Sequence, residues 1–439
     1  MQRGYEIQTK DAIARKRGPT MDEAVQAKHA SDYLSFADVS RASLNWGTHS
    51  YHSYPMRFVP HLAREMIERY SRPGEVIADP FMGSGTVLVE AMLLGRPSMG
   101  IDINPVAVLI AQAKTTIVEP EQLHEACDGF ANALMDPGAS PLIPEENLNR
   151  IQWWFPEHVI HPLGVLNSAI SSVAPDLQPL FKCAFSSILK QCSLWSPHSI
   201  KPIRSEKRHR IEISDPFTAM AKKLARIQKA NAEAWASMGG LQPSAQTRRG
   251  DARSLTWPSD SIDLVVTSPP YLTAYDCSEV FELTLLWMGV KPKAFRNEVI
   301  GSRVLGEHIS VPATSCDDVW LPIVESLKKG RNSTGTVAHR FYYHMYCCLT
   351  EIVRVLRPHG VLVLVTGDSR LRGIDMRNAW CYEQILRRHG LAVKESFTRT
   401  ISGRSLPPAR DPLTGRFLKS ATSLSSIVYA TETVLAFQK

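Results

Sequence analysis

The sequence places two consecutive prolines directly after an apolar run, in VVTSPPYLTAYD at residues 265–276. Proline fixes its φ angle and has no N–H to donate, so the pair must end a strand and form a rigid loop. In such a loop the Ser268 side chain and the Pro269 carbonyl can both accept hydrogen bonds from one –NH₂ group. Two acceptors favour a tetrahedral nitrogen with an available lone pair, and Tyr271 can stack on the attached base, which contributes about 1–3 kcal/mol. The segment therefore predicts a site for an exocyclic amine of a base.

A second segment, DPFMGSGT at residues 79–86, predicts a tight turn between a strand and a helix. Gly83 and Gly85 allow the backbone to turn sharply and to approach a ligand where a Cβ would clash, and the helix that follows offers free N–H groups. Asp102 lies at the end of the next expected strand, where a carboxylate can accept from both hydroxyls of a ribose. The alternative is that Asp102 only caps the helix that begins at Pro105. The loop lacks the G-x-x-x-x-G-K-[ST] pattern of a P-loop.

These motifs lie among elements that alternate between strand and helix, as in a doubly wound parallel sheet. The expected strands occupy residues 75–80, 98–104, 261–271, 361–367, 391–399 and 432–439, and the expected helices occupy 60–70, 86–95, 105–115, 278–289, 341–356 and 378–390. We expect residues 290–338 to form a polar connection. Both motifs fall at the carboxyl ends of strands, where this fold class holds its ligands.

The alternation is interrupted between residues 119 and 246, where helical stretches occur with little strand signal. We therefore expect an α/β, Rossmann-like sheet with a mostly helical insertion. The predicted organisation is an N-terminal arm and cofactor-binding half (1–118), the helical insertion (119–246) and a catalytic half (247–439).

Composition limits the function further. The 439 residues are 44% hydrophobic and 21% charged, with a formal net charge of +7 that suits a polyanionic partner without demanding one. The eight cysteines form no C-x-x-C pair, which indicates reduced thiols in a cytoplasm and neither a zinc framework nor a disulfide scaffold. No apolar stretch is long enough to predict a membrane span, and the N-terminus has no export signal.

Together, DPFMGSGT and TSPPY resemble the S-adenosylmethionine-dependent DNA amino-methyltransferases, which modify cytosine N4 or adenine N6. The resemblance covers most of the chain outside the insertion. YHSYPMRF (51–58) is similar to the family's N-terminal cofactor motif, with Arg57 where the family usually has lysine. GDA (250–252) is similar to the next cofactor element, and VTGDSRLRG (365–373) resembles a strand end that borders the target pocket.

The resemblance implies S-adenosylmethionine as cofactor, direct transfer of its methyl group to the amine, and no metal. Carried over by position, the cofactor-binding residues are Pro55, Asp79, Phe81, Gly83, Gly85, Thr86, Asp102 and Asp251, and the catalytic loop is Ser268, Pro269, Pro270 and Tyr271. Within the first set, Asp102 would bind the ribose and Asp251 would lie near the adenine.

The family also implies double-stranded DNA as partner, with the target base flipped out at a cost of a few kcal/mol. The basic stretch of the insertion supplies the predicted phosphate contacts, namely Lys201, Arg204, Lys207, Arg208 and Arg210. The same charges are also compatible with an ordinary solvated loop. The insertion, with or without the connection 290–338, is the candidate target-recognition region. The other candidates are 290–338 itself and residues 402–420, with Arg404, Arg410, Arg416 and Lys419.

Serine before PPY favours cytosine N4, because adenine N6 members more often carry Asp or Asn there. Three alternatives remain: an adenine-N6 DNA methyltransferase, an RNA guanine-N2 methyltransferase, and a catalytically silent nucleic-acid-binding subunit. The recognition sequence, the oligomeric state and the existence of a restriction endonuclease partner do not follow from the sequence.

Overall fold

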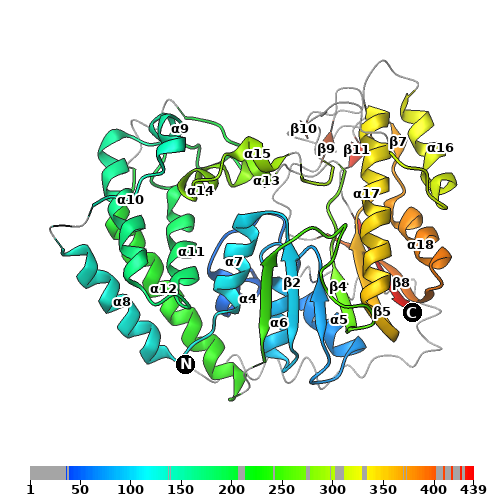
Figure 1. Ribbon diagram of the computed structural model, residues 1–439, viewed down its shortest axis with the longest axis horizontal. Helices are drawn as coiled ribbons and strands as arrows, with labels where there is room; N and C mark the ends of the chain where they lie inside the picture. Colours follow the sequence, from blue (N-terminus) through cyan, green and yellow to red (C-terminus); the bar gives the residue numbers. More distant parts are fainter. Residues whose placement is uncertain are drawn as a thin grey trace.

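The computed structural model describes residues 36, 39–136, 138, 140–205, 213–240, 243–272, 277–296, 298–301, 311–328, 334–368, 370–371, 373–401, 409–410, 417–418, 426–427 and 431–439. Within this part of the chain, a seven-stranded sheet has the order β3-β2-β1-β4-β5-β12-β8 (Figure 1). Its strands are β1 Ile77–Asp79, β2 Ser98–Asp102, β3 Ala245–Arg249, β4 Ile262–Thr267, β5 Leu356–Thr366, β8 Ala392–Thr400 and β12 Thr431–Gln438. The predicted doubly wound, Rossmann-like sheet is confirmed.

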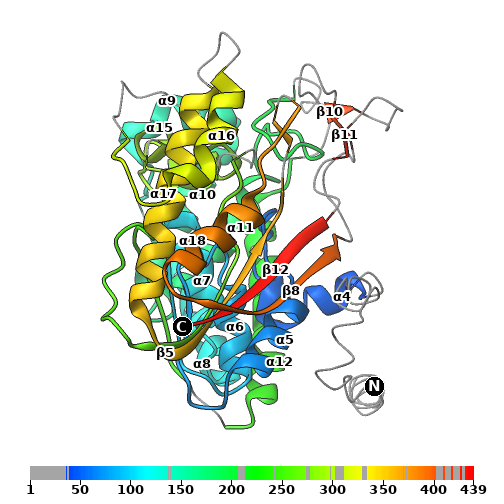
Figure 2. The same cartoon turned by 90° about the vertical axis from the view of Figure 1, so that its right-hand side faces the viewer.

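Strand direction brings the motif-bearing ends together. Strands β3, β2, β1, β4 and β5 pair in parallel, and β12 runs antiparallel between β5 and β8. Figure 2 shows β5, β12 and β8 side by side, with the C-terminus at the end of β12. The strand order reverses at β1 and β4, and the carboxyl ends of strands at such a reversal form the ligand crevice of this fold class.

Alternate residues of the central strands pack against helices on opposite faces of the sheet. Ile77, Leu264 and Val266 are buried with α5 (Pro60–Tyr70) and α6 (Thr86–Leu93). Ala78 and Val265 are buried with the helices of the other face, which are α16 Asp317–Lys328, α17 Thr334–Val355 and α18 Asn378–Arg388. Because both faces are covered, these strands read as continuous apolar runs.

The segment between α7 (Pro105–Thr115) and β3 is mostly helical, as predicted. Its helices are α8 Pro120–Leu134, α9 Leu148–Trp154, α10 Glu157–Ala169, α11 Gln178–Leu189 and α12 Pro216–Met238. They pack with α7 and α14 (Glu282–Trp287) around one apolar core, and Figure 1 shows α8, α10 and α12 beside the sheet on the left. Strand β3 was not predicted; it begins at Ala245, inside the range expected to be insertion.

Two further elements differ from the predictions. The expected helix 278–289 is divided into α13 (Cys277–Val280) and α14 at Phe281. The expected polar connection contains α15 Pro292–Arg296 and α16, whose Trp320 and Val324 are buried.

The remaining described elements are short. They are α4 Arg41–Leu44, the 3₁₀ turns Gly47–Ser50, Glu145–Asn147 and Ile170–Ser172, and the strand pairs β6 Arg370–Leu371 with β7 Ile374–Asp375 and β9 Ala409–Arg410 with β10 Phe417–Leu418 and β11 Ser426–Ile427. The predicted N-terminal arm lies largely outside the described residues. Across the described helices, none combines the length and the hydropathy that a membrane span requires.

Candidate active site

The loop after β1 turns through two left-handed glycines, Gly83 (φ +49°) and Gly85 (φ +74°). A Cβ added to Gly85 would lie 2.8 Å from the Cβ of Ala111, so this glycine is required for the packing of α6 on α7. A Cβ added to Gly83 would lie 3.4 Å from the ring of Tyr54. The structure thus gives Gly85 a packing role that was not predicted, and its expected contact with a ligand stays a prediction.

Two hydroxyl groups of this loop are buried and have no partner among the described residues: Ser84 Oγ and Thr86 Oγ1. Buried polar side-chain atoms are hydrogen-bonded in the large majority of cases, so an unpaired pair at one loop needs an explanation. The loop is followed by the N-terminus of α6, whose first N–H groups also have no partner within the helix. These groups fit a polar ligand at the loop.

Asp79 joins the glycine loop to the catalytic loop. Its side chain is only 3% exposed, and its Oδ1 accepts from Thr267 Oγ1 (2.6 Å) and from the backbone N–H of Phe81 (3.0 Å). Thr267 is the last residue of β4 and directly precedes Ser268. Burial raises the pKa of the Asp79 carboxyl to about 7.

Asp102 is turned toward the glycine loop from the end of β2. Its Oδ2 accepts from the Gly83 N–H (2.9 Å) and its Oδ1 from the Asn104 N–H (2.8 Å), and burial raises the pKa of this carboxyl to about 6. The N-cap of α7 is Asn104, whose side chain accepts from the Val106 N–H (3.0 Å). The alternative role of Asp102 as the cap of that helix is therefore wrong.

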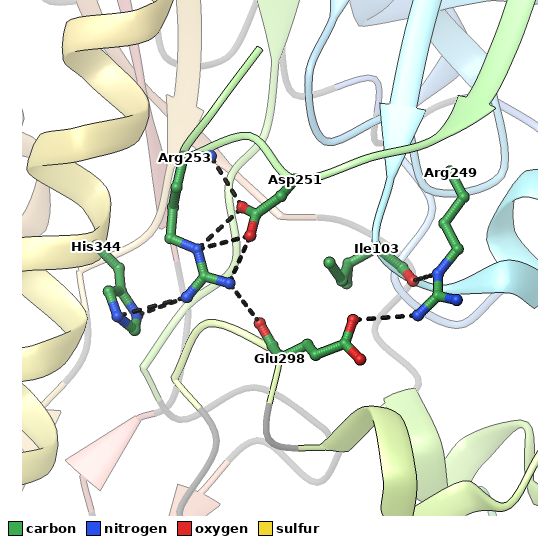
Figure 3. Close-up of polar contacts among 6 residues, drawn as sticks. All are labelled: Ile103, Arg249, Asp251, Arg253, Glu298 and His344. Atoms are coloured by element: carbon green, nitrogen blue, oxygen red, sulfur yellow. Dashed lines mark hydrogen bonds and ion pairs between the residues drawn. The ribbon is translucent and has the colours of Figure 1, made fainter. Parts of the chain in front are cut away.

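Asp251 follows β3 and lies within a network of polar contacts (Figure 3). Its carboxylate accepts from the Arg253 side chain at 2.6–3.0 Å and from the Arg253 N–H at 2.9 Å. The Arg253 guanidinium also donates to the Glu298 carbonyl (3.1 Å) and lies 3.3 Å from Nδ1 of His344 on α17. Hydrogen bonds from Arg253 lower the pKa of Asp251, although burial acts in the opposite direction.

The predicted catalytic loop follows the end of β4, with Pro269 buried and Ser268, Pro270 and Tyr271 half-buried. The Tyr271 hydroxyl donates to Oε1 of Glu432 on β12 at 3.4 Å. Oε2 of Glu432 accepts from Nε of Arg399 on β8 (3.0 Å), and Arg399 is itself buried.

The N-terminal cofactor motif contributes a residue that was not predicted, Tyr54. Its buried ring stacks on Phe281 with centroids 5.1 Å apart and covers Gly83. The predicted Pro55 is exposed beside it. Arg57, which replaces the family's lysine, donates to Asn45 Oδ1 (3.0 Å) and to the His49 carbonyl (3.1 Å), away from the glycine loop. The sequence could have indicated Tyr54, because it is the aromatic residue directly before Pro55.

Of the predicted phosphate contacts, Lys201 and Arg204 are exposed. Arg204 lies 5.4 Å above the ring of Trp153, which is 41% exposed. The structure does not describe Lys207, Arg208 and Arg210, nor the side chains of the candidate loop 402–420. Among the described residues, no group of three His, Cys, Asp or Glu side chains could hold a metal ion.

The sequence matches the DNA methylase family (N6_N4_Mtase) over residues 4–113, a range that includes the glycine loop and Asp102. The type II methyltransferase M.MvaI of Kocuria varians is 24% identical over 91% of this chain and 93% of its own length. M.BsoBI of Geobacillus stearothermophilus is 25% identical over 58% of this chain and 55% of its own length. M.MjaII of Methanocaldococcus jannaschii is 42% identical over 21% of this chain and 17% of its own length. The chain is therefore related to the N4/N6 amino-methyltransferases of DNA, as its two motifs predicted.

Proposed function

We propose that this protein is a DNA methyltransferase that transfers a methyl group from S-adenosylmethionine to an exocyclic amine of a flipped base, with cytosine N4 favoured. The observation that carries the proposal is the hydrogen bond between Thr267 Oγ1 and Asp79 Oδ1 (2.6 Å). It joins the carboxyl ends of β1 and β4, so the glycine loop and the Ser268–Pro269–Pro270–Tyr271 loop leave neighbouring strands at the edge of the sheet where this fold class holds its ligands.

The residues at the glycine loop fit the cofactor. The buried carboxyl of Asp79 and the unpaired hydroxyls of Ser84 and Thr86 suit an amino acid end that carries both an ammonium and a carboxylate. The Asp102 carboxylate retains lone pairs for ribose hydroxyls after it has accepted two backbone N–H bonds. When bound, the cofactor supplies a methyl group on a positively charged sulfur.

The catalytic loop is proposed to prepare the amine. The Ser268 hydroxyl and the Pro269 carbonyl accept its two hydrogens, which makes the nitrogen lone pair more available. Tyr271 stacks on the flipped base. Because a hydroxyl can serve as acceptor for either amine, the preference for cytosine N4 over adenine N6 depends on Ser268 alone.

The DNA itself is proposed to contact the exposed cations of the helical segment, Lys201 and Arg204, through its phosphates. We assign the helical segment as the target-recognition region. Because the related enzyme is a type II methyltransferase, the proposal also includes a restriction endonuclease partner and a cytoplasmic location.

Labelled S-adenosylmethionine incubated with double-stranded DNA, followed by separation of the digested nucleosides, tests the proposal. We expect label in N4-methylcytosine and none in RNA offered under the same conditions. Label in N6-methyladenine would correct the base, and label in RNA guanine would replace the DNA assignment. Binding of DNA without any transfer would identify a silent subunit.

A further inference from the structure

Arg253 lies at the centre of the polar contacts around Asp251, the residue that the family resemblance places near the adenine of the cofactor (Figure 3). Its guanidinium reaches the carboxylate of Asp251 at 2.6–3.0 Å, the carbonyl of Glu298 at 3.1 Å and the ring of His344 at 3.3 Å. These partners belong to the loop after β3, to the segment after α15 and to α17, respectively. Arg253 is therefore fixed from three sides.

The position of Asp251 relative to Asp102 indicates what this arrangement serves. Asp102 pairs with Arg249 across β2 and β3, and the Gly250 N–H donates to the Asp102 carbonyl (3.1 Å). Asp251 thus follows Arg249, the strand partner of Asp102, by two residues. In the proposed cofactor complex, a nucleoside whose hydroxyls bind Asp102 would have its adenine amine at Asp251.

Arg253 and Asp251 differ in the hydrogen bonds that each can make. Arg253 has only donors, so it cannot accept from an amine, whereas a carboxylate offers about four lone-pair positions. In the structure, Asp251 receives the Nε, Nη2 and backbone N–H groups of Arg253. The Nε–H is shared between Oδ1 and Oδ2, so three donor hydrogens serve about four lone-pair positions and leave capacity for one further donor. These contacts also restrict rotation of the carboxylate.

Two further acceptors, the His344 ring and the Glu298 carbonyl, also hold the Arg253 guanidinium. Burial and the neighbouring Arg253 charge lower the pKa of His344 to about 4, so this ring is neutral near pH 7 and can accept from Arg253. The Glu298 carbonyl accepts a second donor. Glu298 also accepts from Arg249 through its carboxylate (3.1 Å), so the segment is held by two arginines of which only Arg253 contacts Asp251.

We propose that Arg253 is a positioning residue for cofactor recognition: it fixes the Asp251 carboxylate so that its remaining acceptor selects the adenine amine. This inference rests on the proposed function. The specific consequence is discrimination between adenine and a base that has a carbonyl in place of the amine, because a fixed carboxylate repels that oxygen.

The test compares binding of S-adenosylmethionine and of its hypoxanthine analogue to the full chain by calorimetry. Arg253→Met is the test variant and Arg249→Met is the matched control, since Arg249 holds the same Glu298 without touching Asp251. A freed carboxylate must be ordered on binding, which corresponds to about a three- to tenfold loss of S-adenosylmethionine affinity. We expect that loss in Arg253→Met together with a smaller preference for adenine, and changes under twofold in Arg249→Met.

Arg253→Lys provides the second variant, because lysine keeps the charge and lacks the forked geometry of the guanidinium. It should behave as Arg253→Met does. Equal weakening for both cofactors, tighter binding, or no change in the arginine-253 variants would each overturn the positioning role. If the parent protein bound neither cofactor, the proposed function would fail and the inference with it; if the parent bound and the variants matched it, only the inference would fail.

Discussion

Asp79 is the residue at which the two motifs meet, and its protonation should control cofactor affinity. A cationic ligand requires the carboxylate, but burial raises the pKa of Asp79 to about 7 and that of Asp102 to about 6. Binding must then release protons at lower pH, so affinity should rise with pH up to about 7 and level off above it, by at most about tenfold per pH unit for each group.

Calorimetry from pH 5 to 8 checks this dependence, with Asp79→Asn as the comparison. Asp79→Asn should bind the cofactor more weakly at pH 8, and its affinity should no longer rise between pH 6 and 7. The rise in affinity below pH 6, which belongs to Asp102, should persist. An unchanged slope in the variant would contradict the assignment of the higher pKa to Asp79.

Tyr271 carries two separable contributions, its ring and its hydroxyl. Tyr271→Phe keeps the ring and removes the hydroxyl that donates to Glu432 (3.4 Å), so kcat/KM for DNA should fall about fivefold, as expected for a bond of about 1 kcal/mol. Tyr271→Ala also removes the stacking ring and should cost about a further 1–3 kcal/mol. Cofactor affinity serves as the control in both variants. A parallel fall in cofactor affinity would show that the loop is structural.

Residue positions were predictable where residue type limits the chemistry: the carboxylates and the PPY loop lie at strand ends, as expected. Tyr54 and Arg253 were not predicted, because their contacts depend on chain segments distant in sequence. Tyr54 packs on Phe281, and Arg253 reaches His344 on α17. Asn104 was likewise overlooked as the cap of α7, although it stands directly before Pro105.

At the scale of elements, the predictions succeeded where burial leaves a hydrophobic pattern. Strands β1 and β4 are buried on both faces and were found from their apolar runs. Strand β3, AQTRR, lies at the sheet edge, pairs only with β2 and is largely exposed, so its sequence carries no such pattern. Helix α16 lies in the range predicted to be a polar connection, and it contains Pro322, a residue that normally argues against a helix interior.

The contact between α6 and α7 gives a prediction about stability. In Gly85→Ala the alanine must adopt a left-handed backbone conformation, which costs about 1–2 kcal/mol. It also places a Cβ 2.8 Å from Ala111, and overpacking adds about 1–3 kcal/mol. Urea unfolding should show the sum of these two costs as a loss in the free energy of unfolding. Gly240→Ala is the matched control, because φ is +87° there and no atom lies within 4 Å. Equal losses in the two variants would mean that helix packing does not constrain Gly85.

On the scale of the whole molecule, the core between the sheet and the helical segment contains a buried lysine. Lys114 on α7 is fully buried, and its Nζ has no partner in the described part of the chain. Burial lowers the pKa of Lys114 from 10.5 to about 7. Between these values the unfolded chain binds more protons than the folded one, so this group makes stability rise with pH from about 7 to 10.5.

Lys114→Met should abolish that rise and stabilise the fold near pH 7 by about 1–3 kcal/mol, the cost of an unpaired buried polar group. Urea unfolding at pH 7 and 9 measures both effects. Lys223→Met is the control, because its amine donates to the Ser50 carbonyl (3.2 Å) and its removal should bring no gain. A destabilised Lys114→Met would show that the amine has a favourable role in this core.

The net charge of +7 suits the proposed DNA partner, but only cations near the proposed site should contact phosphates. Replacing Lys201 and Arg204 together by alanine removes two proposed contacts, so the salt slope of DNA binding should fall by about two, with all sequences weakened alike. Lys394→Ala is the matched control: this exposed lysine lies near the start of β8, at the sheet edge opposite the strand ends that form the site. Its slope should equal that of the parent, and cofactor affinity should be unchanged in both variants. A double variant that kept the parental slope would leave Arg204 and Trp153 as surface packing and would pass the recognition role to another part of the chain.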